Sequence, residues 1–112
     1  MPCIHLEIIY QGAHCPASFY MAQAVEEVLP LYGERVRYTK LEYQRSKDHS
    51  MRFLELSVAL FGEAAVKRGL KLAPIPSLFI NGKLIFDVIP VRDELECAIE
   101  TFLEGRDFVG YE

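Results

Sequence analysis

The chain has 112 residues, of which 51% are hydrophobic, and its formal net charge at pH 7 is -4. This length fits a single domain over residues 1–112, with enough apolar residues to build a core. An acidic chain without clustered lysine and arginine is not expected to bind nucleic acid or an anionic membrane surface. No stretch reaches the ~20 apolar residues of a membrane span, and residues 1–10 lack a signal-peptide pattern, so we expect a cytoplasmic protein.

The first half of the chain alternates between strand and helix patterns. Residues 4–10 form a short apolar run that is typical of a strand buried on both faces. Residues 16–32 repeat apolar or small side chains at helical spacing, and Pro30 should end or kink this helix. Residues 35–43 are rich in β-branched and aromatic side chains, which favours a second strand.

A polar loop predicted at 44–50 leads into a long helix predicted over residues 51–69. This helix carries apolar side chains over a wide arc, in two neighbouring stripes. The first stripe consists of Leu54, Val58, Phe61 and Ala65, and the second of Phe53, Leu60 and Ala64. We expect both stripes to pack in the core of the domain, and the alternative is that one of them is the contact surface of a homodimer.

The last third of the chain predicts a hairpin and a terminal helix. Residues 77–80 and 84–88 are apolar runs joined by Asn81-Gly82, the strongest short-range signal for a two-residue turn. Residues 91–103 form an amphipathic helical pattern. The order βαβαββα predicts an α/β fold with a mixed four-stranded sheet and helices on both faces, because βαβ units pair in parallel and a hairpin pairs antiparallel.

The three cysteines, Cys3, Cys15 and Cys97, are an odd number at wide spacing. This spacing fits neither a disulfide framework nor a paired zinc site, so reduced thiols are expected. The three histidines are as scattered, and Cys3 with His5 would supply only two of the four ligands of a structural zinc. We therefore expect no metal and no cofactor.

Two short motifs fall where one superfamily keeps its active site. The run CPAS at 15–18 follows the first strand at a helix start, and the run IPS at 75–77 precedes the hairpin. Together with the order of elements they resemble the thioredoxin and glutaredoxin proteins. The first run is similar to their CxxC motif with Ser18 in place of the second cysteine, and Pro76 is similar to their cis-proline. The resemblance covers nearly the whole chain and implies a thioredoxin-like fold with Pro76 close to Cys15.

The chain also departs from that superfamily's pattern. It has no tryptophan, whereas thioredoxins usually carry one before the motif, and His14 stands there instead. Residues 88–93 stand where glutaredoxins carry the Gly-rich segment that they use against glutathione. The resemblance therefore does not assign glutathione as a ligand.

The position of Cys15 predicts thiolate chemistry. Unpaired N–H groups and the positive end of the helix dipole lower the pKa of a thiol, which is about 8.5 in a free cysteine. A protonated His14 would lower it further, and the hydroxyl of Ser18 would donate a hydrogen bond to the sulfur. The alternatives are that His14 points to solvent and that Ser18 merely packs on the inner helix face. By the resemblance, Ile75 and Pro76 would bind an extended substrate through the backbone of Ile75.

Neither remaining cysteine is expected to resolve a disulfide on Cys15. Cys3 sits at the opposite end of the first strand from Cys15, and the strand separates the two by over roughly 20 Å, whereas bridged Cα atoms lie within ~7 Å. Cys97 faces away from the apolar stripe of the last helix. The resemblance therefore implies a monothiol protein, a thiol-disulfide oxidoreductase in which Cys15 attacks a protein or small-molecule disulfide and an external thiol resolves the adduct. A redox-inactive binding or adaptor module is the main alternative, and a carrier of a persulfide on Cys15 is the other.

Overall fold

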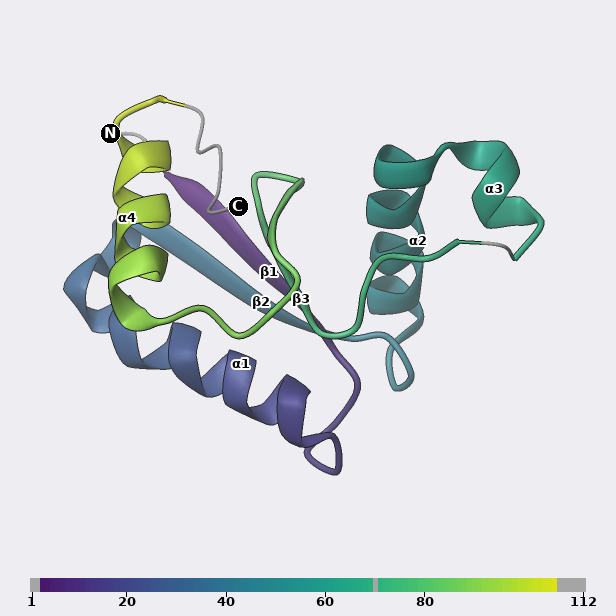
Figure 1. The fold of residues 1–112 in the computed structure, drawn as a ribbon, viewed down its shortest axis with the longest axis horizontal. Helices are drawn as coiled ribbons and strands as arrows, with labels where there is room; N and C mark the ends of the chain where they lie inside the picture. Colours follow the sequence, from purple (N-terminus) through teal and green to yellow (C-terminus); the bar gives the residue numbers. More distant parts are fainter. Residues whose placement is uncertain (1–2, 70, 107–112) are drawn as a thin grey trace.

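The computed structural model describes residues 3–69 and 71–106 and has an α/β architecture (Figure 1). Its four-stranded sheet has the order β2-β1-β3-β4. The strands are β1 (Ile4–Tyr10), β2 (Val36–Glu42), β3 (Ser77–Ile80) and β4 (Lys83–Phe86). The helices are α1 (Pro16–Val28), α2 (Lys47–Phe61), α3 (Glu63–Lys67) and α4 (Arg92–Leu103), with short 3-10 turns η1 (Leu29–Leu31) and η2 (Gly33–Arg35).

Strand β1 is an inner strand and is paired on both sides. It runs parallel to β2 over its whole length, from Ile4 opposite Val36 to Tyr10 opposite Glu42. On its other side it runs antiparallel to β3. A parallel neighbour requires a crossover connection, which α1 supplies. The predicted mixed sheet is therefore present, and the carboxyl ends of β1 and β2 meet at one edge.

Strands β3 and β4 form the predicted hairpin. Asn81 and Gly82 have φ angles of 51° and 81°. A two-residue turn of this type needs positive φ at both positions, and Asn and Gly tolerate it best. The second strand of the hairpin, β4, spans Lys83–Phe86 instead of the predicted 84–88. The pairing register between β3 and β4 shifts so that Ile85 is an extra residue without an opposite partner, as in a β-bulge.

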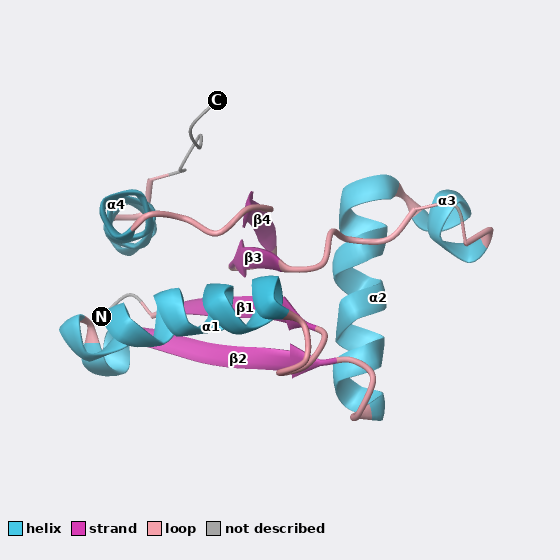
Figure 2. Cartoon of the chain, turned by 60° about the horizontal axis from the view of Figure 1, so that its bottom comes forward, coloured by secondary structure: helices cyan, strands magenta, loops and turns pink. Residues whose placement is uncertain are grey.

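Helices cover the two faces of the sheet unequally (Figure 2). α1 and α4 share one face, where Leu6 and Ile8 of β1 are fully buried beneath them. α2 stands at the carboxyl ends of β1 and β2 on the other face, and there Phe53 and Leu56 pack with Ile9. The core therefore has two parts, one on each side of β1.

The long predicted helix differs from expectation at both of its ends. It begins within the predicted loop 44–50, because the Ser46 hydroxyl caps it by accepting a hydrogen bond from the N–H of His49 at 3.4 Å. It ends at Gly62, whose φ of 90° and ψ of 153° lie outside the helical region. The predicted helix 51–69 is therefore two helices, α2 and the short α3.

The prediction that Leu54, Val58 and Phe61 belong to the core is wrong. These side chains are 44%, 36% and 37% exposed, whereas Phe53 and Leu56 are 4% and 2% exposed. Only one side of α2 faces the sheet, and that side carries Phe53 and the partly buried Leu60 of the second predicted stripe. The third member of that stripe, Ala64, lies in α3 and is exposed, so the prediction that it packs in the core is also wrong. Because both stripes are apolar, composition alone does not tell which one is buried.

A buried serine fixes α2 to the segment that leads into β3. The hydroxyl of Ser57 donates to the carbonyl of Phe53 at 2.9 Å and accepts from the N–H of Ala73 at 2.9 Å. Ser57 is 0% and Ala73 is 3% exposed. This pair of bonds satisfies a backbone donor that lies in irregular chain.

The two remaining helices agree well with prediction. α1 ends at Val28 and continues as the 3-10 turn η1 around Pro30, so the predicted helix 16–32 does end at its proline. α4 spans Arg92–Leu103, one residue shorter than the predicted 91–103.

Candidate active site

Cys15 lies at the amino-terminal end of α1, after the loop that leaves the carboxyl end of β1. It is the N-cap residue, with extended backbone at φ -97° and ψ 105°, and Pro16 takes the first helical position. Its N–H donates to the carbonyl of Gly12 at 3.0 Å, and its own carbonyl accepts from the N–H of Phe19 at 3.0 Å. The sulfur is therefore held beside the unpaired N–H groups and the positive end of the α1 dipole.

The pKa of the Cys15 thiol is lowered, chiefly by a hydrogen bond from the side chain of Ser18 and then by bonds from the backbone N–H groups of Ser18 and Ala17. Ser18 is 0% exposed, and its Oγ accepts from the N–H of Gln11 at 3.3 Å. The Ser18 oxygen accepts the bond from Gln11, and the hydroxyl proton of Ser18 is donated to the sulfur of Cys15. Ser18 therefore both packs on the inner face of α1 and supports a thiolate.

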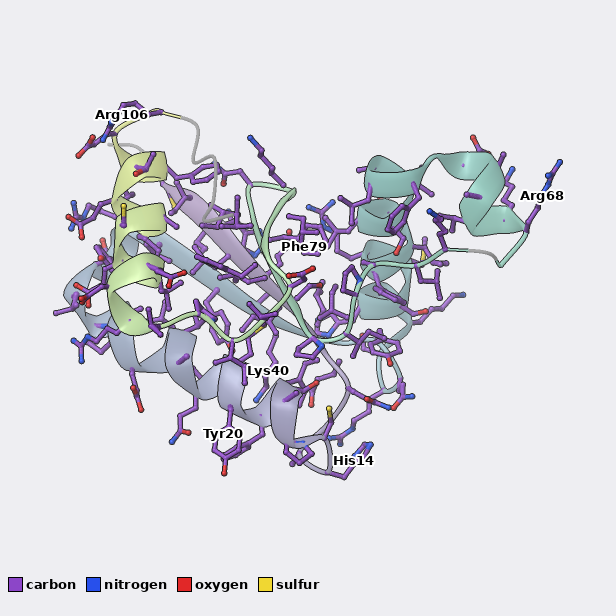
Figure 3. The ribbon with its side chains drawn as sticks, in the orientation of Figure 1. His14, Tyr20, Lys40, Arg68, Phe79 and Arg106 are labelled. Atoms are coloured by element: carbon purple, nitrogen blue, oxygen red, sulfur yellow. The ribbon has the colours of Figure 1, made fainter. Side chains whose placement is uncertain are left out.

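His14 precedes Cys15 on the surface of the molecule, beside the start of α1 (Figure 3). Its ring packs against Gly12, where an added Cβ would lie 2.6 Å from His14 Cε1. Gly12 also has a φ of 151°, a backbone conformation that L residues with a side chain rarely adopt. The bonds that lower the pKa of Cys15 come from Ser18 and Ala17. That a protonated His14 also lowers the pKa of the Cys15 thiol stays a prediction.

The turn at residues 75–76 lies at the same edge of the sheet as the end of β1. The peptide bond between Ile75 and Pro76 is cis, as predicted. In the antiparallel register Ile9 is opposite Ser77, so the turn comes where β1 ends and the chain continues toward Cys15. Ile75 is 39% exposed, and its role in binding a substrate stays a prediction. The predicted contact between Pro76 and Cys15 stays a prediction.

Tyr43 is a neighbour of Cys15 that the sequence motifs do not reveal. The pKa of its phenol is raised by burial and, to a smaller extent, by the negative charge of the Cys15 thiolate. Its ring packs on Phe53 of α2, with ring centroids 4.7 Å apart. Tyr43 directly follows β2, as the loop to Cys15 follows β1. The parallel pairing of these strands is the signal that would have found it.

A buried ion pair on the α2 face was also not evident from the sequence. Glu7 of β1 is 2% exposed, and Arg52 of α2 binds it with two hydrogen bonds, Nε to Oε2 and Nη2 to Oε1, both 2.8 Å long. The pKa of Arg52 is raised, first of all by its bond to Glu7. Glu7 lies within an apolar run, and its partner is 45 residues away in the chain, so no local sequence pattern predicts this ion pair.

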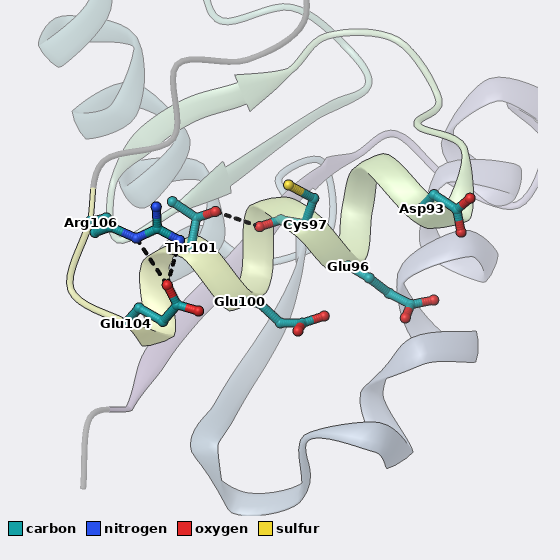
Figure 4. Close-up of a pocket in the computed structure, with 7 residues that line it drawn as sticks. All are labelled: Asp93, Glu96, Cys97, Glu100, Thr101, Glu104 and Arg106. Carbon is teal, nitrogen blue, oxygen red and sulfur yellow. Dashed lines mark hydrogen bonds and ion pairs between the residues drawn. The ribbon is translucent and has the colours of Figure 1, made fainter.

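The surface of the described residues is hollowed near α1 and along α4. A hollow of about 200 Å³ includes Phe19, one helical turn after Cys15, and is lined by Tyr10, Phe19, Ala22, Gln23, Glu26 and Lys40. A larger hollow, of about 440 Å³, runs along α4 and is lined by Asp93, Glu96, Cys97, Glu100, Thr101, Glu104 and Arg106 (Figure 4). The larger hollow contains neither Cys15 nor its hydrogen-bond partners. We therefore place the candidate site at Cys15 and not in the larger hollow.

The other two cysteines are free and exposed, as predicted for Cys97. Within residues 3–69 and 71–106, no three His, Cys, Asp or Glu side chains are grouped in a way that could hold a metal ion. The same part of the chain contains no helix that is both long and apolar enough to cross a membrane.

No protein-family model matches the chain, and no curated protein matches it in sequence. The candidate site is therefore described by its own chemistry alone.

Proposed function

We propose that this chain is a thioredoxin-like monothiol protein that carries out thiol-disulfide exchange through Cys15. The order of the elements, the β2-β1-β3-β4 sheet and the CPAS run at the start of α1 support the resemblance. The observation that carries the proposal is the lowered pKa of the Cys15 thiol at a helix N-terminus. A thiol attacks a disulfide only as the thiolate, so a lowered pKa increases the reactive fraction at neutral pH.

The proposed reaction has two exchange steps. The Cys15 thiolate attacks one sulfur of a protein or small-molecule disulfide, forms a mixed disulfide, and displaces the other sulfur as a thiolate that takes a proton from solvent. The thiolate of an external thiol then attacks the substrate sulfur of the mixed disulfide and releases Cys15 as a thiolate. In net terms, one half of the original disulfide is released as a thiol, and the other half leaves joined to the external thiol in a new disulfide. The Ser18 hydroxyl stabilises Cys15 both before attack and as the leaving group.

An external thiol is needed because the chain offers no neighbouring cysteine. Ser18 holds the place that the second cysteine would take. Cys97 lies on the exposed side of α4, in the larger hollow, and Cys3 precedes the first residue of β1. A hydroxyl does not displace a sulfur from a disulfide, so the mixed disulfide waits for a thiol from solution.

Alkylation of the native protein tests the first requirement. In a background with Cys3→Ser and Cys97→Ser, Cys15 should react with iodoacetamide faster than an unstructured thiol at pH values below about 8, where a free cysteine is mainly protonated. Cys15→Ser should abolish the reaction. Ser18→Ala should move the midpoint of the rate-against-pH profile upward, because it removes the largest cause of the lowered pKa.

A second variant tests for turnover. Ser18→Cys restores two cysteines at a helical spacing of three residues, close enough to form a disulfide, and it should reduce a small aromatic disulfide in the presence of a dithiol. If Cys15 reacts no faster than an unstructured thiol and the Ser18→Cys variant shows no exchange, the redox-inactive binding module is the better description.

A further inference from the structure

Helix α2 carries a second apolar surface on the side that does not face the sheet. It consists of Met51, Leu54, Val58 and Phe61, which are 57%, 44%, 36% and 37% exposed, and we call these four residues the α2 outer stripe. Their spacings of three, four and three residues are those of the a and d positions of a heptad. Such a narrow seam is the surface that one helix presents to another helix.

The other helices of the sheet do not share this feature. α4 exposes no large apolar side chain, and α1 exposes only Phe19 and Tyr20 in its first turns. The inner side of α2 already supplies its core contacts through Phe53 and Leu56. The α2 outer stripe is therefore additional to what the fold of one chain uses, and its area is left in contact with water.

We propose that the α2 outer stripe is the contact surface of a homodimer in which two α2 helices pack antiparallel about a two-fold axis. With the axis level with Leu56, Met51 meets Phe61 of the second copy and Leu54 meets Val58 of the second copy. Each layer then pairs a larger apolar side chain with another apolar one, and the same four residues serve both copies. The stripe thus complements itself, as a two-fold interface requires.

Charge favours a second copy on this side of the molecule. The chain has a net charge of -4, yet residues 47–71 contain five basic and three acidic residues. Arg52 is paired with the buried Glu7, so the remaining charges of this segment nearly balance. A contact between two copies through α2 therefore avoids the repulsion that they would meet at the exposed side of α4, which is strongly acidic.

Charge also favours the antiparallel direction. Asp48 lies in the first turn of α2, and Arg68 and Lys71 lie beyond its last turn, where the Lys71 ammonium is 5.5 Å from the Phe61 ring. Antiparallel packing brings Asp48 toward the basic end of the second copy and opposes the two helix dipoles. Parallel packing would bring Lys47 against Lys47 and Arg68 against Arg68.

The size of the contact sets the expected strength. α2 has 15 residues and is therefore about 22 Å long at ~1.5 Å per residue. A single pair of helices of this length lies at the small end of specific interfaces, near the roughly 1,000 Å² that a biological contact should exceed. We therefore expect a dimer that forms at micromolar concentrations and dissociates on dilution.

Sedimentation velocity over a dilution series from about 1 µM to 1 mM tests the association. The wild-type chain should shift from monomer to dimer within this range, and Leu54→Glu and Val58→Glu should remain monomeric. Leu31→Glu is the matched control, because Leu31 is 52% exposed but lies in η1, and it should dimerise like the wild type. Circular dichroism verifies that each variant is folded. A wild-type chain that is monomeric throughout, or a Leu54→Glu variant that dimerises as well as Leu31→Glu, overturns the proposal.

Cross-linking tests the direction of packing. In a background without native cysteines, a tagged Leu54→Cys chain mixed with an untagged Val58→Cys chain should form mainly the mixed disulfide under mild oxidation. A predominance of Leu54→Cys chains linked to each other would instead mean parallel packing and would overturn the antiparallel arrangement. These measurements do not use Cys15, so their outcome is independent of the proposed exchange activity.

Discussion

The sulfur of Cys15 owes its lowered pKa to hydrogen bonds and not to a sheltered position. The side chain of Ser18 makes the largest contribution and burial acts in the opposite direction. Cys15 is itself partly exposed. A thiolate that is both stabilised and accessible is the combination that a nucleophile needs. The position of the Ser18 hydroxyl depends in turn on Gln11, whose backbone N–H donates a hydrogen bond to the Ser18 oxygen.

The lowered pKa of Cys15 predicts a pH dependence of stability. The folded chain binds a proton on this thiol less readily than the unfolded chain, so the thiolate stabilises the fold above the unfolded pKa, and this contribution is lost as pH falls through the folded pKa. Urea unfolding of the wild type and of Cys15→Ser at several pH values measures it. The stability advantage of the wild type should grow from neutral pH to above about pH 8.5. A difference that is constant with pH would contradict the pKa assignment.

The ion pair between Glu7 and Arg52 predicts a large effect of a single substitution. Arg52→Met leaves a carboxylate that is 2% exposed without its partner and should lower the free energy of unfolding by about 3 kcal/mol, the low end of the range for a broken buried pair. The low end applies because the Arg52 side chain is 37% exposed.

The double variant Glu7→Leu with Arg52→Met is the control for that prediction, because it removes the stranded charge as well as the pair. It should recover most of the lost stability. Guanidinium unfolding measures both variants, and an Arg52→Met variant as stable as the wild type would show that Glu7 does not depend on this partner.

At the scale of elements, α2 shows how one helix serves two surfaces. Its inner side packs Phe53 and Leu56 on the end of the sheet, and its outer side leaves Phe61 partly open. A helical pattern with apolar residues over a wide arc predicts a helix but not the side from which the sheet approaches. The sequence alone therefore could not distinguish core from contact surface.

A matched pair of substitutions in α2 separates the two sides. Phe53→Ala should lower the free energy of unfolding by about 3 to 5 kcal/mol, the usual cost of deleting a buried phenylalanine. Phe61→Ala should cost less than about 2 kcal/mol, because Phe61 is 37% exposed whereas Phe53 is 4% exposed. Thermal or urea unfolding in the Leu54→Glu background, which should stay monomeric, measures both variants as monomers. Equal losses for the two would place Phe61 in the core after all.

Most elements could be predicted because each has a local signal. A continuous apolar run predicted β1, a segment rich in β-branched and aromatic residues predicted β2, Asn81-Gly82 predicted the hairpin, and Pro30 predicted the end of α1. The break at Gly62 was missed because an isolated glycine is often tolerated inside a helix. Cys15 and Ser18 were found because a helix start and a three-residue spacing are visible in sequence. Tyr43 was not, because its proximity depends on strand pairing.

At the scale of the whole molecule, the elements converge on one edge of the sheet. The carboxyl ends of β1 and β2 and the amino end of β3 meet there, and they bring with them Cys15, Tyr43 and the turn at Ile75. α2 stands at this same edge, with its inner side joined to the site through Tyr43 and its outer side directed away. The candidate site and the α2 outer stripe therefore occupy opposite sides of one helix.

Association through α2 predicts that stability depends on protein concentration. A dimer that forms only from folded chains adds its binding free energy to the stability of the fold. The midpoint of thermal unfolding should therefore rise between about 1 µM and 1 mM for the wild type and for Leu31→Glu, and it should stay constant for Leu54→Glu. A midpoint that is independent of concentration in all three proteins would argue against coupled folding and association.

The two hydrogen bonds of Ser57 have a consequence for the exchange of amide protons with solvent deuterium. The N–H of Ala73 lies in irregular chain, where amides usually exchange quickly, yet it is buried and its proton is bound to a hydroxyl that belongs to α2. That proton can exchange only when the loop before β3 separates from the helix. The exchange rate of the Ala73 amide therefore reports how often the segment that contains the Ile75 turn separates from α2. This measurement needs no label at the candidate site.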